Sequence, residues 1–264
     1  MKISVITVVR NDLKGLKKTV ESVISQSDHN FEYIIIDGNS TDGCKEYLEA
    51  LQCPMPLQKL SEPDTGIYNA MNKGIMMATG DYCIFMNAGD KFYDKNVIHS
   101  ICEVIGDADI YIGSTIKIGK HSIHKRHPLK NMTLTQLFLS RGIYHQSTVT
   151  RTALLKEHPY REDLKIVSDW HFLFEQWLNG AKYETLNFVV SIFDIGGTSS
   201  DSETAMKEKY KVLEEIFPNE RVRLNIMPQE KIWGKIYKAM AKSPISRDIA
   251  LIKYGVKYLI RDLF

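Results

Sequence analysis

The residues of this chain best suited to chemistry are polar side chains that directly follow short apolar runs. The runs are continuous and rich in β-branched residues, which is typical of strands buried on both faces of a parallel sheet. In sheets of alternating strands and helices, ligands bind outside the carboxyl ends of the strands. We therefore expect a binding site where these polar residues meet. They are Arg10 and Asn11, Asp37, Asp64, and the run from Asn87 to Asp90.

The elements that must position these residues alternate along the first 90 residues. Apolar residues recur at the helical spacing of 3.6 between the buried runs, and Asn11 or Asp12 is suited to cap the first helix. This order predicts an α/β fold with a mostly parallel, doubly wound central sheet flanked by helices. The predicted strands are Ile3–Val9, Phe31–Ile36, Leu57–Leu60 and Tyr82–Met86. Three helices are predicted between them: one that begins near Leu13, a short one that ends near Leu51, and one that spans 66–79.

After residue 90 the alternation is looser. Ser168 is predicted to cap a helix whose core stripe holds Trp170, Leu173, Phe174, Trp177 and Leu178. The other expected elements are a hairpin of Ile110–Ile118 and Ser122–Arg126, a helix at Thr133–Ser140, strands at Gln146–Thr150 and Tyr183–Phe193, a polar loop at Gly196–Ser202 and a helix at 204–217.

The composition is that of a soluble globular protein. Its 264 residues, 44% hydrophobic and 25% charged, suffice for one α/β catalytic domain with an appendage. Cys44, Cys53, Cys83 and Cys102 lack metal-type spacing and are expected to be reduced core thiols. Neither a signal peptide nor an apolar run of about 18 residues is recognisable, so we expect a cytoplasmic location.

The net charge of +2 conceals a basic C-terminal segment. Residues 230–264 hold eight Lys or Arg against three acids, 8 − 3 = +5, so residues 1–229 sum to about −3. Two basic amphipathic helices broken at Ser243-Pro244 suit an anionic membrane surface on the inner face of the cell membrane. Docking on the catalytic domain is the alternative. Nucleic acid is disfavoured, because the basic residues are confined to this segment and no nucleic-acid-binding motif is present.

Several segments in this order resemble family 2 glycosyltransferases of the GT-A fold, especially bacterial enzymes of polysaccharide assembly. They are ISVITVVRN, IIIDGNSTDG, SEPDTGIYNAMNKGI, ATGDY, FMNAGD and VSDW. The resemblance implies a catalytic domain at 1–203, with a nucleotide-sugar part at about 1–118 and an acceptor part at about 119–203, followed by a helical extension at 204–264. It also implies an inverting transfer of a hexosyl or N-acetylhexosaminyl group from a nucleotide-sugar, expected to be a UDP-sugar, to a hydroxyl of a glycan or lipid-linked acceptor.

The resemblance assigns a set of residues to the donor. Asp37 is expected to hydrogen-bond the uracil, and Lys73 to approach the diphosphate. The alternatives are that Asp37 only forms a turn, Asp64 only caps a helix and Lys73 is only solvated. The full expected donor set is Thr7, Val9, Arg10, Asn11, Asp37, Asp64, Tyr68, Asn72, Lys73, Asn87 and Ala88.

Asn87-Ala88-Gly89-Asp90 stands where the family carries its Asp-x-Asp-type metal motif. A departing diphosphate needs its growing charge neutralised, usually by Mg²⁺ or Mn²⁺ held by carboxylates. Because the first acid is replaced by Asn87, only Asp90 remains as a strong oxygen ligand. We therefore expect the cation to bind weakly without the donor.

Asp169 is the expected catalytic base. It follows Ser168 at a helix start and lies off the apolar stripe, so it is able to face a cleft and accept the acceptor's proton. The alternatives are a carboxylate that only stabilises the helix dipole, or a base at Glu162 or Asp163. His145 and Trp170 are assigned to the acceptor side. A different class of function stays open, namely a catalytically silent nucleotide-sugar or glycan-binding module on the same fold, because Asn87 replaces the first acid of the metal motif.

Overall fold

The computed structural model describes residues 1–119, 122–128, 143–194 and 202–216. The chain divides into two compact units, Met1–Asp201 and Ser202–Phe264. In the second unit the structure describes one helix, α8 (Ser202–Ile216). The helix expected at 133–140, most of the loop expected at 196–202 and the basic segment 230–264 lie outside the described residues. None of the described helices combines the length and apolar character needed to cross a bilayer.

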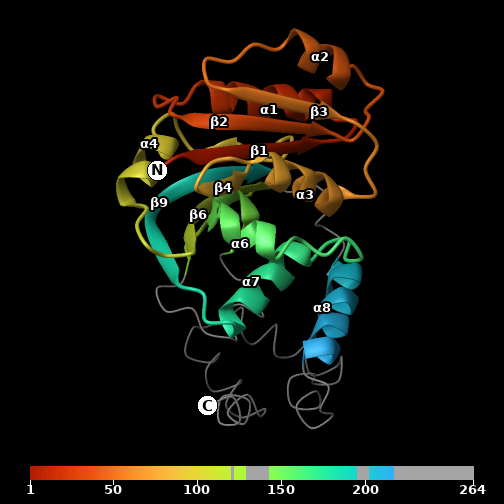
Figure 1. The fold of residues 1–264 in the computed structure, drawn as a ribbon, viewed down its shortest axis with the longest axis vertical. Coiled ribbons are helices and arrows are strands. Elements are labelled where there is room, and N and C mark those ends of the chain that lie inside the picture. Colours follow the sequence, from red (N-terminus) through yellow and green to blue (C-terminus); the bar gives the residue numbers. More distant parts are fainter. Residues whose placement is uncertain (120–121, 129–142, 195–201, 217–264) are drawn as a thin grey trace. The chain divides into compact units, whose positions relative to one another are not determined.

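The first half of the unit Met1–Asp201 is a regular parallel sheet with strand order β3-β2-β1-β4 (Figure 1). Every residue of β1, β2 and β4 is buried, which explains their continuous apolar sequences. The elements are β1 (Ile3–Val9), α1 (Leu13–Ile24), β2 (Phe31–Asp37), α2 (Cys44–Ala50), β3 (Leu57–Ser61), α3 (Ile67–Met77) and β4 (Tyr82–Phe85).

The second half extends this sheet with mixed strand directions, in the order β4-β8-β6-β9-β5, and β7 pairs with β6. β8 is antiparallel to β4 and β6, whereas β6 and β9 are parallel with shifts in register around Ser114. The elements are β5 (Lys91–Phe92), α4 (Val97–Val104), β6 (Ile110–Gly119), β7 (Ser122–Arg126), η1 (His145–Ser147), β8 (Thr148–Arg151), α6 (Thr152–Glu157), α7 (Ser168–Leu178) and β9 (Tyr183–Asp194).

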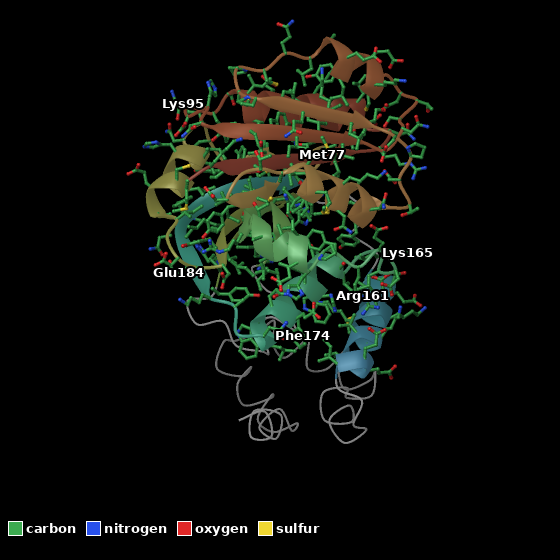
Figure 2. The ribbon with its side chains drawn as sticks, viewed as in Figure 1. Met77, Lys95, Arg161, Lys165, Phe174 and Glu184 are labelled. Atoms are coloured by element: carbon green, nitrogen blue, oxygen red, sulfur yellow. The ribbon has the colours of Figure 1, made fainter. Side chains whose placement is uncertain are left out.

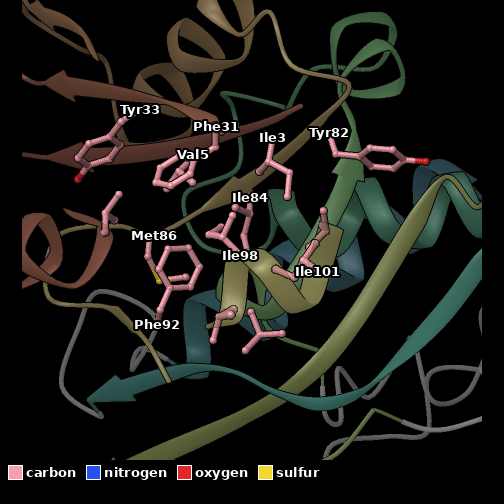
Figure 3. Close-up of a cluster of buried hydrophobic side chains, with 14 of the residues drawn as sticks. Ile3, Val5, Phe31, Tyr33, Tyr82, Ile84, Met86, Phe92, Ile98 and Ile101 are labelled. Atoms are coloured by element: carbon pink, nitrogen blue, oxygen red, sulfur yellow. The ribbon is translucent and has the colours of Figure 1, made fainter. Parts of the chain in front are cut away.

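The core between this sheet and helices α1 and α4 is built from large side chains that are almost completely buried (Figure 3). Phe31, Ile84 and Ile101 are each at most 1% exposed. Burying one such side chain contributes about 1.5–3 kcal/mol. This packing holds the carboxyl ends of β1, β2 and β4 in fixed positions, which is what a site at that edge requires.

Three expectations need correction. β5, α4 and α6 were not predicted, because they are short and interrupt the alternation. The strand expected from Gln146 begins at Thr148, because His145–Ser147 form a 3₁₀ turn. Ser168 does not cap α7: Val167 occupies the cap position, and the Ser168 hydroxyl is buried without a hydrogen-bond partner.

Candidate functional site

A cavity of about 600 Å³ opens where the ends of β1 and β4 meet the start of α3 and the segment between α6 and α7. Its size is within the range of small-molecule sites, and its place at the carboxyl ends of parallel strands is where such folds bind ligands. Figure 2 draws the surrounding side chains and labels Arg161 and Lys165 on that segment. The lining residues are Val8, Val9, Arg10, Asp12, Asp64, Thr65, Gly66, Ile67, Tyr68, Asn69, Ala70, Asn87, Ala88, Glu162, Leu164 and Lys165.

Asp64 organises the mouth of this cavity. Its carboxylate accepts a hydrogen bond from the Gly66 N–H at 3.1 Å and pairs with the Arg10 guanidinium at 3.3 Å. A Cβ atom on Gly38 would lie 2.0 Å from Asp64 Oδ2, so any other residue at position 38 would displace the Asp64 carboxylate. Asp64 is only 4% exposed, whereas Arg10 is 60% exposed. The buried acid therefore anchors a cationic side chain beside the cavity.

The Asp169 carboxylate lies at the start of α7 and is held by three donors. The Tyr68 hydroxyl and the Trp170 N–H reach Oδ1 at 3.0 and 2.8 Å, and His145 Nδ1 lies 3.2 Å from Oδ2. Burial raises the pKa of Asp169, but the hydrogen bond and charge of His145, with the other two donors, lower it below its ordinary value. Asp169 is thus an ionised carboxylate in a fixed orientation, and 25% of its side chain is exposed.

His145 also faces the other expected acid. Its Nε2 lies 3.2 Å from Asn87 Nδ2 and 4.0 Å from Asp90 Oδ2. Burial raises the pKa of Asp90 to about 6, although the charge of nearby His145 opposes that rise. The pKa of His145 is raised, because its contacts with Asp169 and Asp90 outweigh the lowering effect of burial.

The side-chain oxygen of Asn87, which contacts His145 through its amide nitrogen, is unsatisfied. Asn87 Oδ1 is buried and has no hydrogen-bond partner. A desolvated carboxylate beside an unpaired amide oxygen fits a divalent cation, which prefers such ligands. Within the described part of the chain, no group of three His, Cys, Asp or Glu side chains is arranged to hold a metal.

The turn that carries Asn87 and Asp90 is fixed by α1. The Thr19 hydroxyl lies 2.6 Å from the Asp90 carbonyl and 3.1 Å from the Asn87 carbonyl, and it accepts the Gly89 N–H at 3.0 Å. Gly89 adopts a φ of 96°, a left-handed conformation that favours glycine. The sequence Asn-Ala-Gly-Asp therefore folds as a tight turn at the end of β4.

Three residues expected to bind the donor are engaged within the protein instead of lining the cavity. Thr7 is fully buried, and its hydroxyl donates to the Met86 carbonyl at 2.6 Å. Asn11 Oδ1 accepts the Thr41 N–H at 2.9 Å. The Asp37 carboxylate is also fully buried and accepts the Ser61 hydroxyl at 2.6 Å. The structure keeps these side chains beneath or beside the site.

The polar face of α3 divides between the cavity and the segment after α6. Asn72 hydrogen-bonds the Tyr160 carbonyl at 2.8 Å and Glu162 at 3.1 Å. Lys73 pairs with Glu62 at 2.8 Å. Tyr68 does line the cavity, but its hydroxyl is committed to the Ile166 carbonyl and Asp169. Asn72 and Lys73 thus hold neighbouring segments together.

The sequence analysis named Glu162 only as an alternative base and did not predict it in the cavity wall. Glu162 lines it, and its carboxylate accepts the Asn69 amide at 2.9 Å. Asp163, the other alternative base, pairs with Arg161 at 2.7 Å. Trp170, expected on the acceptor side, is 6% exposed and stacks on Phe174. Asn69 and Glu162 are 93 residues apart in the sequence, so no local pattern predicts their contact.

Sequence comparison finds relatives of this chain among glycosyltransferases. The sequence model described as "Glycosyl transferase family 2" matches residues 4–162. An uncharacterized glycosyltransferase of Mycobacterium tuberculosis is 31% identical over 208 residues, 76% of this chain and 78% of that protein. A PGL/p-HBAD biosynthesis glycosyltransferase of Mycobacterium bovis is 27% identical over 205 residues, 75% of this chain and 78% of that protein.

Solved structures share the fold. Residues 1–349 of S. aureus TarS in complex with UDP-GlcNAc superpose with a TM-score of 0.63 at 18% identity, covering 88% of this chain and 77% of that one. The mannosyltransferase PcManGT from Pyrobaculum calidifontis, in complex with GDP-Man and Mn²⁺, gives a TM-score of 0.60 at 12% identity, covering 99% of this chain and 81% of that one.

Proposed function

The chain belongs to glycosyl transferase family 2, and we propose that this glycosyltransferase inverts the anomeric centre as it transfers a sugar from a UDP-sugar to a hydroxyl. The fold is of the GT-A type. The proposed acceptor is a glycan or a lipid-linked glycan, and the transferred group a hexosyl or N-acetylhexosaminyl unit. The UDP-GlcNAc bound to TarS and the similarity to a PGL/p-HBAD biosynthesis glycosyltransferase support this choice.

The observation that carries the proposal is the environment of Asp169. Its ionised, partly exposed carboxylate accepts a hydrogen bond from Tyr68, which lines the cavity, and Tyr68, Trp170 and His145 hold it in one orientation. A general base needs a defined position more than a high pKa, because its reach to the acceptor hydroxyl comes first. The fixed orientation and the ionised state of Asp169 support its assignment as the base.

The proposed donor position follows from the cavity wall. The nucleotide-sugar would lie along the ends of β1 and β4, against Val9, Arg10 and Ala88. Arg10 would face the diphosphate, because it is the exposed cation that Asp64 anchors there. Asp90, with the amide oxygen of Asn87, would hold a Mg²⁺ or Mn²⁺ ion that neutralises the leaving diphosphate. The Mn²⁺ bound to PcManGT supports a divalent cation.

The proposed reaction is a single displacement. The acceptor oxygen forms a bond to the anomeric carbon while the bond between that carbon and the diphosphate oxygen breaks. The acceptor proton passes to an Asp169 oxygen, and the electron pair of the broken bond leaves with the nucleoside diphosphate. Because the nucleophile attacks opposite the leaving group, the anomeric configuration inverts.

The test replaces Asp169 with asparagine. Asp169→Asn keeps the size of the side chain and an oxygen for Tyr68 and Trp170, so UDP-sugar affinity by calorimetry should persist. Transfer should fall by about 10²–10⁴, the usual contribution of a general base. NMR of the wild-type product should show the inverted anomer.

Two matched variants serve as controls. Asp163→Asn removes a nearby acid that pairs with Arg161 and should leave turnover within a few-fold of wild type. Glu162→Gln removes the alternative base in the cavity and should alter transfer less than Asp169→Asn does. Normal turnover in Asp169→Asn would move the base to another residue. Donor binding without any transfer by the wild type would favour the silent binding module.

A further inference from the structure

We propose that His145 is a ligand of the divalent cation, with Nε2 completing a site formed by Asp90 and Asn87. The proposal rests on the proposed function, since the cation is the one that would neutralise the donor diphosphate. It assigns this histidine, first expected on the acceptor side, to the metal and to the base at once.

The first argument concerns the tautomer of His145. An ionised carboxylate only accepts hydrogen bonds, so the contact with Asp169 Oδ2 at 3.2 Å places a proton on Nδ1. In the neutral ring, Nε2 then carries a lone pair. Metal-binding histidines in proteins commonly donate their other ring N–H to a carboxylate, which fixes the ring and makes the ligating nitrogen more basic. His145 and Asp169 have this arrangement.

The second argument concerns where the free nitrogen points. Nε2 lies 3.2 Å from the Asn87 amide and 4.0 Å from Asp90 Oδ2. Two ligands of one ion with bonds of about 2.1 Å lie about 3–4 Å apart, depending on the angle between them. His145 Nε2 therefore lies at ligand spacing from the Asp90 carboxylate and from the Asn87 amide group.

The third argument concerns the unsatisfied oxygen of Asn87. The side-chain amide now donates through Nδ2 to His145 Nε2, which leaves Oδ1 buried and unpaired. Such an orphan acceptor costs about 1–3 kcal/mol. With the ring neutral, turning the amide by 180° would bring Oδ1 toward the Nε2 lone pair, an arrangement that is repulsive unless a metal ion or a proton lies between the two atoms. A cation thus satisfies both atoms at once.

A histidine ligand also suits the altered motif. With Asn87 in place of the first acid, the site has one carboxylate, Asp90, and a neutral nitrogen ligand adds affinity without adding charge. Mg²⁺ is bound almost entirely through oxygen, whereas imidazole is a ligand for first-row transition metals. Loss of His145 should therefore weaken Mn²⁺ binding more than Mg²⁺ binding.

The test measures metal binding directly, without catalysis. Mn²⁺ is titrated into the full-length protein with saturating UDP, and free Mn²⁺ is followed by electron paramagnetic resonance. His145→Asn keeps an N–H near Asp169 but lacks a group at Nε2, and it should raise the Mn²⁺ Kd at least about tenfold. The matched control is His158→Asn, at a partly exposed histidine paired with Glu157, which should leave the Kd unchanged.

A spectroscopic readout makes the outcome decisive even if His145→Asn folds poorly. Pulsed electron paramagnetic resonance of the wild-type Mn²⁺ complex should show ¹⁴N coupling from an imidazole, and this coupling should disappear in His145→Asn. Mn²⁺ binding that depends on Asp90 but shows no nitrogen coupling would overturn the proposal and leave the proposed function intact. Wild-type protein that binds UDP and transfers sugar without binding Mn²⁺ would overturn it as well.

Discussion

Glu32 and Asp90 are both buried acids of the unit Met1–Asp201, 2% and 6% exposed. They lie at opposite ends of the parallel strands: Glu32 is near the amino end of β2, and Asp90 follows the carboxyl end of β4. Glu32, near the start of β2, accepts hydrogen bonds from the Ser4 and Thr79 hydroxyls, from the Thr79 and Gly80 N–H groups and from Lys2 Nζ. Burial raises its pKa, but these donors outweigh burial and lower it to about 2. Asp90, after β4, has a pKa raised to about 6 by burial.

The difference separates a structural acid from a functional one. Glu32 accepts hydrogen bonds from two segments, residues 2–4 and the turn at 79–80. It thereby joins β1, β2 and the turn before β4, so it stabilises the fold as a charged group. Asp90 is desolvated without equivalent compensation and lies next to the unpaired oxygen of Asn87. Sites retain such destabilising features when a ligand supplies the missing interaction.

The largest effect that would sharpen this comparison is on catalysis. Asp90→Ala should reduce transfer at least roughly 10³-fold, because it removes the charged ligand of the cation that stabilises the leaving group. Thermal unfolding should show an intact fold. Glu32→Gln should leave turnover per folded molecule unchanged. A turnover of Asp90→Ala near that of wild type would remove Asp90 from the site.

The next effect is on stability, and here Glu32 is the residue whose replacement has the larger effect. Glu32→Gln should lower the free energy of unfolding in urea by about 2–4 kcal/mol, because an amide cannot accept all of the bonds that the carboxylate receives. The exposed Glu49 of α2 provides the control, and Glu49→Gln should change stability by less than about 0.5 kcal/mol. Equal effects of the two variants would contradict the structural role of Glu32.

The smallest effect is the dependence of stability on pH. The folded pKa of Asp90, about 6, lies above its ordinary 3.8, so its charge costs stability above pH 6 and the cost fades as pH falls toward 3.8. Asp90→Asn should thus stabilise the metal-free protein at pH 7 by about 1–3 kcal/mol and by little at pH 4.

Glu32 should show the opposite slope in a lower pH window. Its folded pKa, about 2, lies below 4.5, so its contribution is complete above pH 4.5 and is lost as pH falls toward 2. The penalty of Glu32→Gln should shrink in that window. Unfolding curves of each variant and the wild type across pH 2–7 check both slopes, and parallel slopes would abolish the distinction between the acids.

The sequence by itself determined the regular half of the molecule. Ile3–Val9 and Phe31–Asp37 are strands because each is a continuous β-branched run, and such runs are stable only when both faces are covered. Asp12, one of the two residues that the local pattern offered as the cap of α1, accepts a hydrogen bond from the Gly15 N–H. The polar residues at strand ends, and the identity of the family, follow from the same local signals.

Tertiary structure alone decided how those polar residues are used. Tyr68 and Asp169 are 101 residues apart, and His145 and Asn87 are 58 apart, yet each pair is in contact. The pairs meet because β8 joins β4 in an antiparallel direction and α7 follows the segment that packs on α3. Such contacts depend on how elements pack, which periodicity does not encode. For the same reason Thr7 and Asp37 are buried while Glu162 faces the cavity.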